Sequence, residues 1–81
     1  MMKPGDTTTF VATDEFAVVL AATQRVWPQR STDYRITVVN RAGETVVSCP
    51  TGGSEKSARA LANTAWTNLR AGVDPKLVWN T

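Results

Sequence analysis

The sequence predicts a small α+β domain in which an antiparallel β-hairpin packs on a C-terminal helix. Residues 34–40 and 44–49 are rich in β-prone side chains and flank a turn that contains glycine. Residues 54–71 place apolar side chains at steps of three and four, which is the spacing of an amphipathic helix. The 81 residues are expected to form a single domain, with residues 1–6 as a loose N-terminal end.

A short strand followed by a helix is predicted before the hairpin. Residues 7–12, TTTFVA, are β-prone, and Thr13 suits a helix N-cap because two acidic residues follow it in the first turn. We therefore predict a helix at about 14–26. The alternative is a buried strand at 16–22, since every residue there is apolar and two valines are adjacent.

The turn of the hairpin determines which side chains share a face. Residues 40–43, NRAG, fit a type I turn in which Gly43 takes the left-handed conformation of a β-bulge. This turn pairs Val38 with Val46. The predicted core face consists of Tyr34, Ile36, Val38 and Val46. The second face consists of Arg35, Thr37, Val39, Thr45, Val47 and Cys49.

The C-terminal helix is expected to begin after an N-cap at Ser54 and to end at Gly72. Its apolar stripe is rich in alanine, with Trp66 as the expected core anchor. Trp27 and Trp79 lie at the ends of elements and are also expected to contact the core, with at least one of them partly exposed. The polar side of the helix is either a solvated surface or a docking edge for phosphates or acidic side chains. It carries Lys56, Arg59, Asn63, Thr67 and Arg70.

The chemistry of the side chains argues against an enzyme. The chain has no histidine and one cysteine, which excludes Ser–His and Cys–His pairs and the usual zinc ligand sets. We interpret Cys49 as an inert, half-buried thiol. Residues 51–57, TGGSEKS, precede a helix as a phosphate-binding loop does, but Glu55 stands where that motif needs glycine. No catalytic, cofactor-binding or metal-binding residue is predicted.

Localisation is expected to be cytoplasmic, without contact to a membrane. The N-terminus has no apolar run typical of a signal peptide, and the longest apolar run, 16–22, is shorter than the ~18 residues of a membrane span. One cysteine is typical of a reducing compartment. The net charge of +2 is low for a dedicated nucleic-acid binder, which usually has a denser basic stripe.

The second face of the hairpin is too apolar for a freely solvated sheet and too polar for a dry core. Either the N-terminal helix covers it, or a partner or a second copy of the chain does. This face and the lack of catalytic groups predict a non-catalytic protein-interaction module with a protein partner, or a homodimer through the sheet face. The candidate partner-binding residues are Arg35, Thr37, Val39, Arg41, Val47, Lys56, Arg59, Arg70 and Trp79.

Two resemblances extend this hypothesis. The layout YRITVVNRAGETVVS followed by SEKSARALANTAW resembles the arm-binding domains of tyrosine recombinases, which read DNA with the sheet face. That resemblance implies a nucleic-acid-binding module as the alternative function. The basic residues of the hairpin and helix that would serve it are Arg35, Arg41, Lys56, Arg59 and Arg70. In size and style the chain is similar to small phage inhibitors, including anti-CRISPR proteins. This second resemblance implies a phage or mobile-element inhibitor that binds a larger protein complex.

Overall fold

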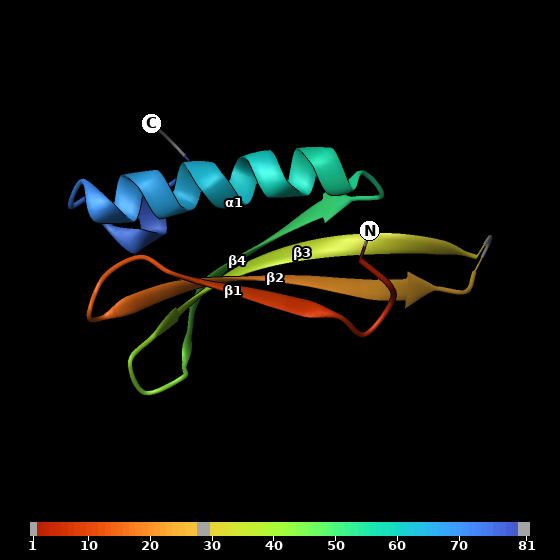
Figure 1. Cartoon of the computed structure of the whole chain (residues 1–81), viewed down its shortest axis with the longest axis horizontal. Coiled ribbons are helices and arrows are strands. Elements are labelled where there is room, and N and C mark those ends of the chain that lie inside the picture. Colours follow the sequence, from red (N-terminus) through yellow and green to blue (C-terminus); the bar gives the residue numbers. More distant parts are fainter. Residues whose placement is uncertain (1, 28–29, 80–81) are drawn as a thin grey trace.

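The computed structural model describes residues 2–27 and 30–79, and its main feature is a four-stranded antiparallel sheet with one long helix on one face (Figure 1). The strands lie in the sheet in chain order, so each pairs with the next along the chain. The α+β class is therefore confirmed. The elements are β1 (Thr7–Val11), β2 (Phe16–Arg25), β3 (Ser31–Asn40), β4 (Thr45–Gly52), α1 (Glu55–Arg70) and the short 3-10 helix η1 (Pro75–Leu77).

The predicted N-terminal helix at 14–26 is wrong, because β2 occupies most of that segment. The alternative, a strand at 16–22, is correct. An apolar run without polar interruptions has no period that separates a helix from a strand. Pairing with β1 on one side and β3 on the other decides in favour of the strand. The expected N-cap, Thr13, instead closes the β1–β2 turn, where its hydroxyl accepts the Phe16 N–H at 3.1 Å.

The N-terminal segment also differs from the expected loose end. The Met2 side chain is 7% exposed and belongs to the core cluster, and its N–H donates to Glu55 at 2.8 Å. The Gly5 N–H donates to the Ala22 carbonyl, which continues the pairing with β2. Residues 2–6 are therefore attached to both the sheet and the helix. The following strand, β1, confirms the short strand predicted at 7–12.

The β3–β4 hairpin is confirmed, but its predicted register holds only beside the turn. Gly43 has the expected positive φ of 83°. A bulge then follows at Val46, so Val38 pairs with Val47 and no longer with Val46. One extra residue moves every later side chain to the opposite face. The assignment of Val47 and Cys49 to the second face is therefore wrong, since both lie on the face toward α1.

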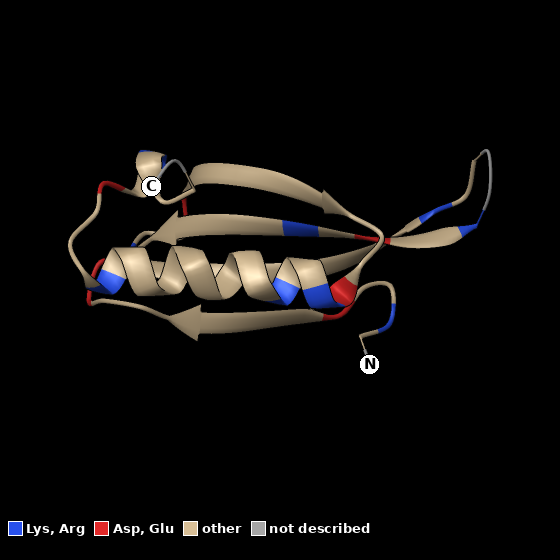
Figure 2. Ribbon diagram, turned by 90° about the horizontal axis from the view of Figure 1, so that it is seen from above, with Lys and Arg blue, Asp and Glu red and all other residues tan. Residues whose placement is uncertain are grey.

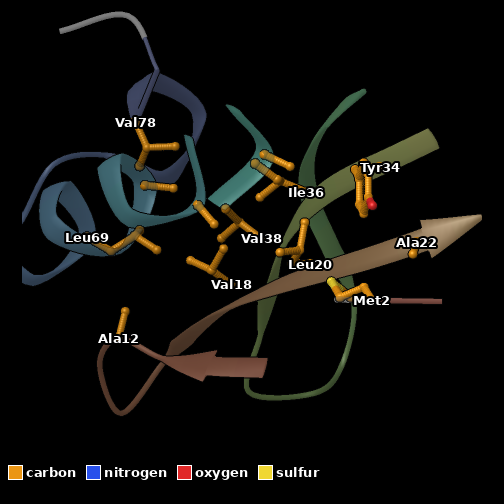
Figure 3. Close-up of a cluster of buried hydrophobic side chains, with 13 residues drawn as sticks. Met2, Ala12, Val18, Leu20, Ala22, Tyr34, Ile36, Val38, Leu69 and Val78 are labelled. Carbon is orange, nitrogen blue, oxygen red and sulfur yellow. The ribbon is translucent and has the colours of Figure 1, made fainter. Parts of the chain in front are cut away.

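The core lies between α1 and the sheet (Figure 3). Helix α1 begins at the predicted cap, where the Ser54 hydroxyl accepts the Ser57 N–H. Its small residues let it lie close to the sheet, and a tail residue beyond η1, Val78, closes one end of the core. The side chains that α1 buries are Ala58, Ala62, Ala65 and Leu69. Opposite them, β2 and β3 bury Val18, Leu20, Ala22, Tyr34, Ile36 and Val38.

The tryptophans do not form the centre of this core. The predicted core anchor, Trp66, is only partly buried; it lies toward the β1 side of α1 and donates its indole N–H to the Val11 carbonyl at 3.0 Å. Trp79 is partly buried and donates to the Leu61 carbonyl at 3.0 Å. Trp27, expected in the core, is 82% exposed just beyond β2. The helical spacing that assigned Trp27 to the core does not apply to a strand.

In the part of the chain that the structure describes, no helix is long and apolar enough to cross a membrane.

Candidate functional site

The sheet face opposite α1 has no described segment packed on it (Figure 1). Helix α1 covers only one face, and the segment expected to cover the other is strand β2. We call this uncovered surface the open face. It consists of Thr7, Thr9, Val11, Ala17, Val19, Ala21, Thr23, Asp33, Arg35, Thr37, Val39, Thr45, Ser48 and Pro50.

The strand register arranges the open face in rows across the sheet. One row consists of Thr9, Val19, Thr37 and Ser48. The next row consists of Val11, Ala17, Val39 and Thr45. Apolar side chains thus occupy the inner strands, while the edge strands carry threonine and serine together with Val11 on β1 and Pro50 on β4. The open face therefore combines an apolar centre with a rim in which hydroxyl groups predominate.

Hydrogen bonds hold the polar side of the open face in place. The Arg35 guanidinium donates to the Ser48 hydroxyl at 2.8 Å across β3 and β4. The hydroxyls of Thr37 and Ser48 are 3.4 Å apart. Arg35 is exposed, so the rest of its guanidinium faces solvent. A fixed arginine of this kind can bind a partner at a low cost in side-chain entropy.

One end of the open face is hollowed beside the turn between β3 and β4. This hollow has a volume of about 230 Å³, and its lining includes Val11, Ala17 and Arg41. The carboxylate-bearing residues Asp14 and Glu15 line the same hollow from the β1–β2 turn. Arg41 is therefore at the edge of the open face, beside negative charge.

The remaining candidate residues lie elsewhere. Lys56, Arg59 and Arg70 are on α1, on the other side of the sheet, and Val47 and Trp79 pack against the core. Figure 2 shows Lys and Arg residues distributed along the molecule and not gathered in one stripe. The structure thus brings together only Arg35, Thr37 and Val39, with Arg41 beside them.

The apolar centre of the open face comes largely from residues that sequence reasoning did not select. Ala17, Val19 and Ala21 belong to β2, which was expected to be helical. The alternative prediction, a strand at 16–22, could have identified them. A strand with only apolar residues has apolar side chains on both of its faces. Val11, 70% exposed on β1, was also not selected.

Across residues 2–27 and 30–79, no three His, Cys, Asp or Glu side chains gather in a way that would hold a metal ion. The pKa of Glu55 is held below its ordinary value of 4.5, chiefly by the backbone N–H of Met2 and then by Arg59 at 3.0 Å. These contacts join the N-terminal segment to α1, so the shifted pKa belongs to a structural contact.

No protein-family model, curated protein or solved structure matches the chain. The function is therefore inferred from the chemistry of its surfaces.

Proposed function

We propose that the chain is a non-catalytic protein-interaction module that binds a larger protein complex through the open face. The observation that carries this proposal is the composition of β2. From Phe16 to Ala22 this strand has no polar side chain, yet the described chain covers only one of its faces. A strand with one face in water normally alternates apolar and polar residues, whereas a continuous apolar run is typical of a strand covered on both faces.

The chemistry of the open face fits a protein surface. Its centre offers Ala17, Val19 and Val39, which are small or branched and lose little conformational freedom on binding. Its rim offers hydroxyl groups and the fixed guanidinium of Arg35 for hydrogen bonds. An apolar centre inside a polar rim is the usual arrangement of protein–protein interfaces. A module of this kind acts by occupying a surface, which is also how a small phage inhibitor would act.

The charge distribution favours a protein partner over nucleic acid. Of the cations assigned to nucleic-acid binding, Arg35 lies on the open face and Arg41 lies beside it, next to Asp14 and Glu15. The others lie on α1, behind the sheet. A phosphate backbone needs cations along one surface, because each neutralised phosphate adds to the affinity.

The test is affinity capture from native lysate with two variants of equal charge. Val39→Lys places an ammonium in the open face, and Ala60→Lys places one on the exposed side of α1. Val39 is half-buried on an inner strand, so we expect Val39→Lys to lower the free energy of unfolding by about 1 kcal/mol and to lose the partner. Ala60→Lys should keep it.

Two results would contradict the proposal. A folded Val39→Lys variant that captures the same partner as the unmodified chain would show that the open face is not the interface. Loss of all captured material after nuclease treatment would favour the nucleic-acid alternative.

A further inference from the structure

The outer edge of β1 is a second unpartnered surface, formed by backbone groups of residues whose side chains belong to the open face. The Ala22 N–H donates to the Asp6 carbonyl, and the Ala12 N–H donates to the Phe16 carbonyl. In an antiparallel pair the residues that bond to the partner alternate with residues whose backbone groups point away. The groups of Thr7, Thr9 and Val11 therefore point to the outer edge. In the described chain their one partner there is Trp66, which donates to the Val11 carbonyl.

The two edges of the sheet differ in how they are protected. Strand β4 contains Pro50, which lacks an N–H; it is also bulged and packs against η1. Strand β1, TTTFV, has no proline, charge or irregular pairing. Natural sheets normally protect an edge with such features, because an open edge accepts a further strand. The open edge at β1 is therefore a ready site for strand addition.

A groove runs between this edge and α1. Its volume is about 300 Å³, which is at the small end of ligand pockets. The groove exists because α1 packs mainly on β2 and β3, so β1 extends beyond the helix. It is lined by Phe10, Arg59, Ala62, Asn63 and Trp66. In a strand added to β1, alternate side chains point toward α1, and one of them would enter this mostly apolar groove.

Positive charge flanks the groove. Arg59 lines it, and Arg70 stacks on the ring of Trp66, with its guanidinium carbon 4.8 Å from the ring centroid. Arg59 forms an ion pair with Glu55 through its Nε–H at 3.0 Å, which offsets part of its charge, and the described structure assigns no partner to its terminal amino groups. Lys56 is exposed one turn earlier on α1. The edge is therefore matched to a strand that carries negative charge.

The spacing of the cations also fits a strand. Arg59 and Arg70 are eleven positions apart on α1, which corresponds to about 16 Å along the helix axis. Two side chains on the same face of a strand, four positions apart, are separated by about 14 Å. An acidic residue two positions before and two positions after an apolar residue would therefore reach both arginines.

We propose that the β1 edge and α1 bind an extended acidic peptide of a protein partner, which adds to the sheet as a further strand. Its backbone pairs with Thr7 and Thr9, its apolar side chain enters the groove, and its flanking carboxylates meet Arg59 and Arg70. This is strand addition, in which backbone bonds supply affinity and alternate side chains supply specificity. The site uses the backbone of Thr7 and Thr9 and no side chain of the open face.

The probe is a fluorescein-labelled peptide blocked at both ends. A central leucine has a glutamate two positions away on each side, and threonine fills the other positions. A second peptide carries lysine in place of both glutamates. By fluorescence polarisation we expect the glutamate peptide to bind the full chain at least about tenfold more tightly than the lysine peptide. Equal affinities, or no saturable binding of the glutamate peptide, would overturn the proposal.

The edge is tested by Thr9→Pro with Thr9→Val as its control. Proline removes the outward N–H of Thr9 and is tolerated where a strand's N–H faces solvent, whereas valine keeps that N–H. We expect Thr9→Pro to weaken the glutamate peptide about tenfold or more, and Thr9→Val to change it less than about twofold. Undiminished binding to a folded Thr9→Pro variant would exclude strand addition.

A charge swap decides the question independently of the proline variant. The double variant carries Arg59→Glu and Arg70→Glu, both at exposed positions. We expect this variant to bind the lysine peptide more tightly than the glutamate peptide. An unchanged preference would overturn the proposal. So would a dimer of the unmodified chain that Thr9→Pro dissociates in sedimentation equilibrium, because a second copy would then occupy the edge. Val39→Lys should leave peptide affinity unchanged, which separates this site from the open face.

Discussion

Replacing Leu20 and Val19 by alanine, one at a time, measures the two faces of β2 directly. Leu20 is 0% exposed and lies against α1, whereas Val19 is partly buried on the open face. Leu20→Ala removes about three methylene equivalents, or about 2.4 kcal/mol of transfer free energy, and leaves a cavity. With the cavity included, we expect it to lower the free energy of unfolding by about 3–4 kcal/mol.

Val19→Ala should cost far less. It removes about two methylene equivalents from a side chain that is already partly in water, and no packed neighbour is left facing a cavity. With the lower strand propensity of alanine added, we expect a loss of about 1 kcal/mol. For a domain of this size, the melting temperature should fall by about 4–8 °C for Val19→Ala and by roughly three times that for Leu20→Ala.

Urea unfolding followed by circular dichroism gives both free energies. The dependence of the unfolding free energy on urea concentration should be equal for the two variants and the unmodified chain, which shows that the denatured state is unchanged. The comparison distinguishes a strand from a helix, because a helix at 14–26 would place Val19 and Leu20 on the same apolar stripe. Similar losses for the two variants, both above about 2 kcal/mol, would refute the assignment of opposite faces.

Trp66, Gly43 and Glu55 can each be tested by unfolding in the same way. Trp66→Phe should lower the unfolding free energy by about 1 kcal/mol, since it removes the bond to the Val11 carbonyl; a loss above about 3 kcal/mol in urea unfolding would mean that Trp66 is a core residue. Gly43→Ala should cost about 1 kcal/mol or more because φ is 83° there, and an unchanged melting temperature would contradict that turn. The pKa of Glu55 is lowered by the Met2 N–H and Arg59, so its stabilisation is complete above pH 4.5 and is lost as the pH falls through the folded pKa. Unfolding of Glu55→Gln and the unmodified chain should therefore differ near pH 6 and converge in acid; a difference that stays constant with pH would contradict this contact.

The features that depend on residues close together in the sequence were predictable. The stripe of α1, its cap at Ser54 and the turn at Gly43 are all confirmed, because each depends on local chemistry. Segment 16–22 was not predictable in the same way, since an uninterrupted apolar run suits a helix and a doubly covered strand equally well. Its conformation depends on pairing with β1 and β3, which are separate segments of the chain.

The candidate site was predictable in part, for a related reason. Arg35, Thr37 and Val39 lie on one face because β3 is regular, and a strand has a side-chain period of two. Val47 was misplaced because the bulge at Val46 has no signature in the residues around it. The contribution of β2 to the open face was missed together with its strand.

The most direct test of the open face is methyl NMR of the full chain with a soluble paramagnetic reagent. Signals of Val19 and Val39 should broaden strongly in the free protein, while those of Val18 and Val38, which face α1, should not. After addition of the captured partner, Val19 and Val39 should become protected. If they are already as protected as Val18 and Val38 in the free protein, or stay broadened in the complex, the open face is not the interaction surface.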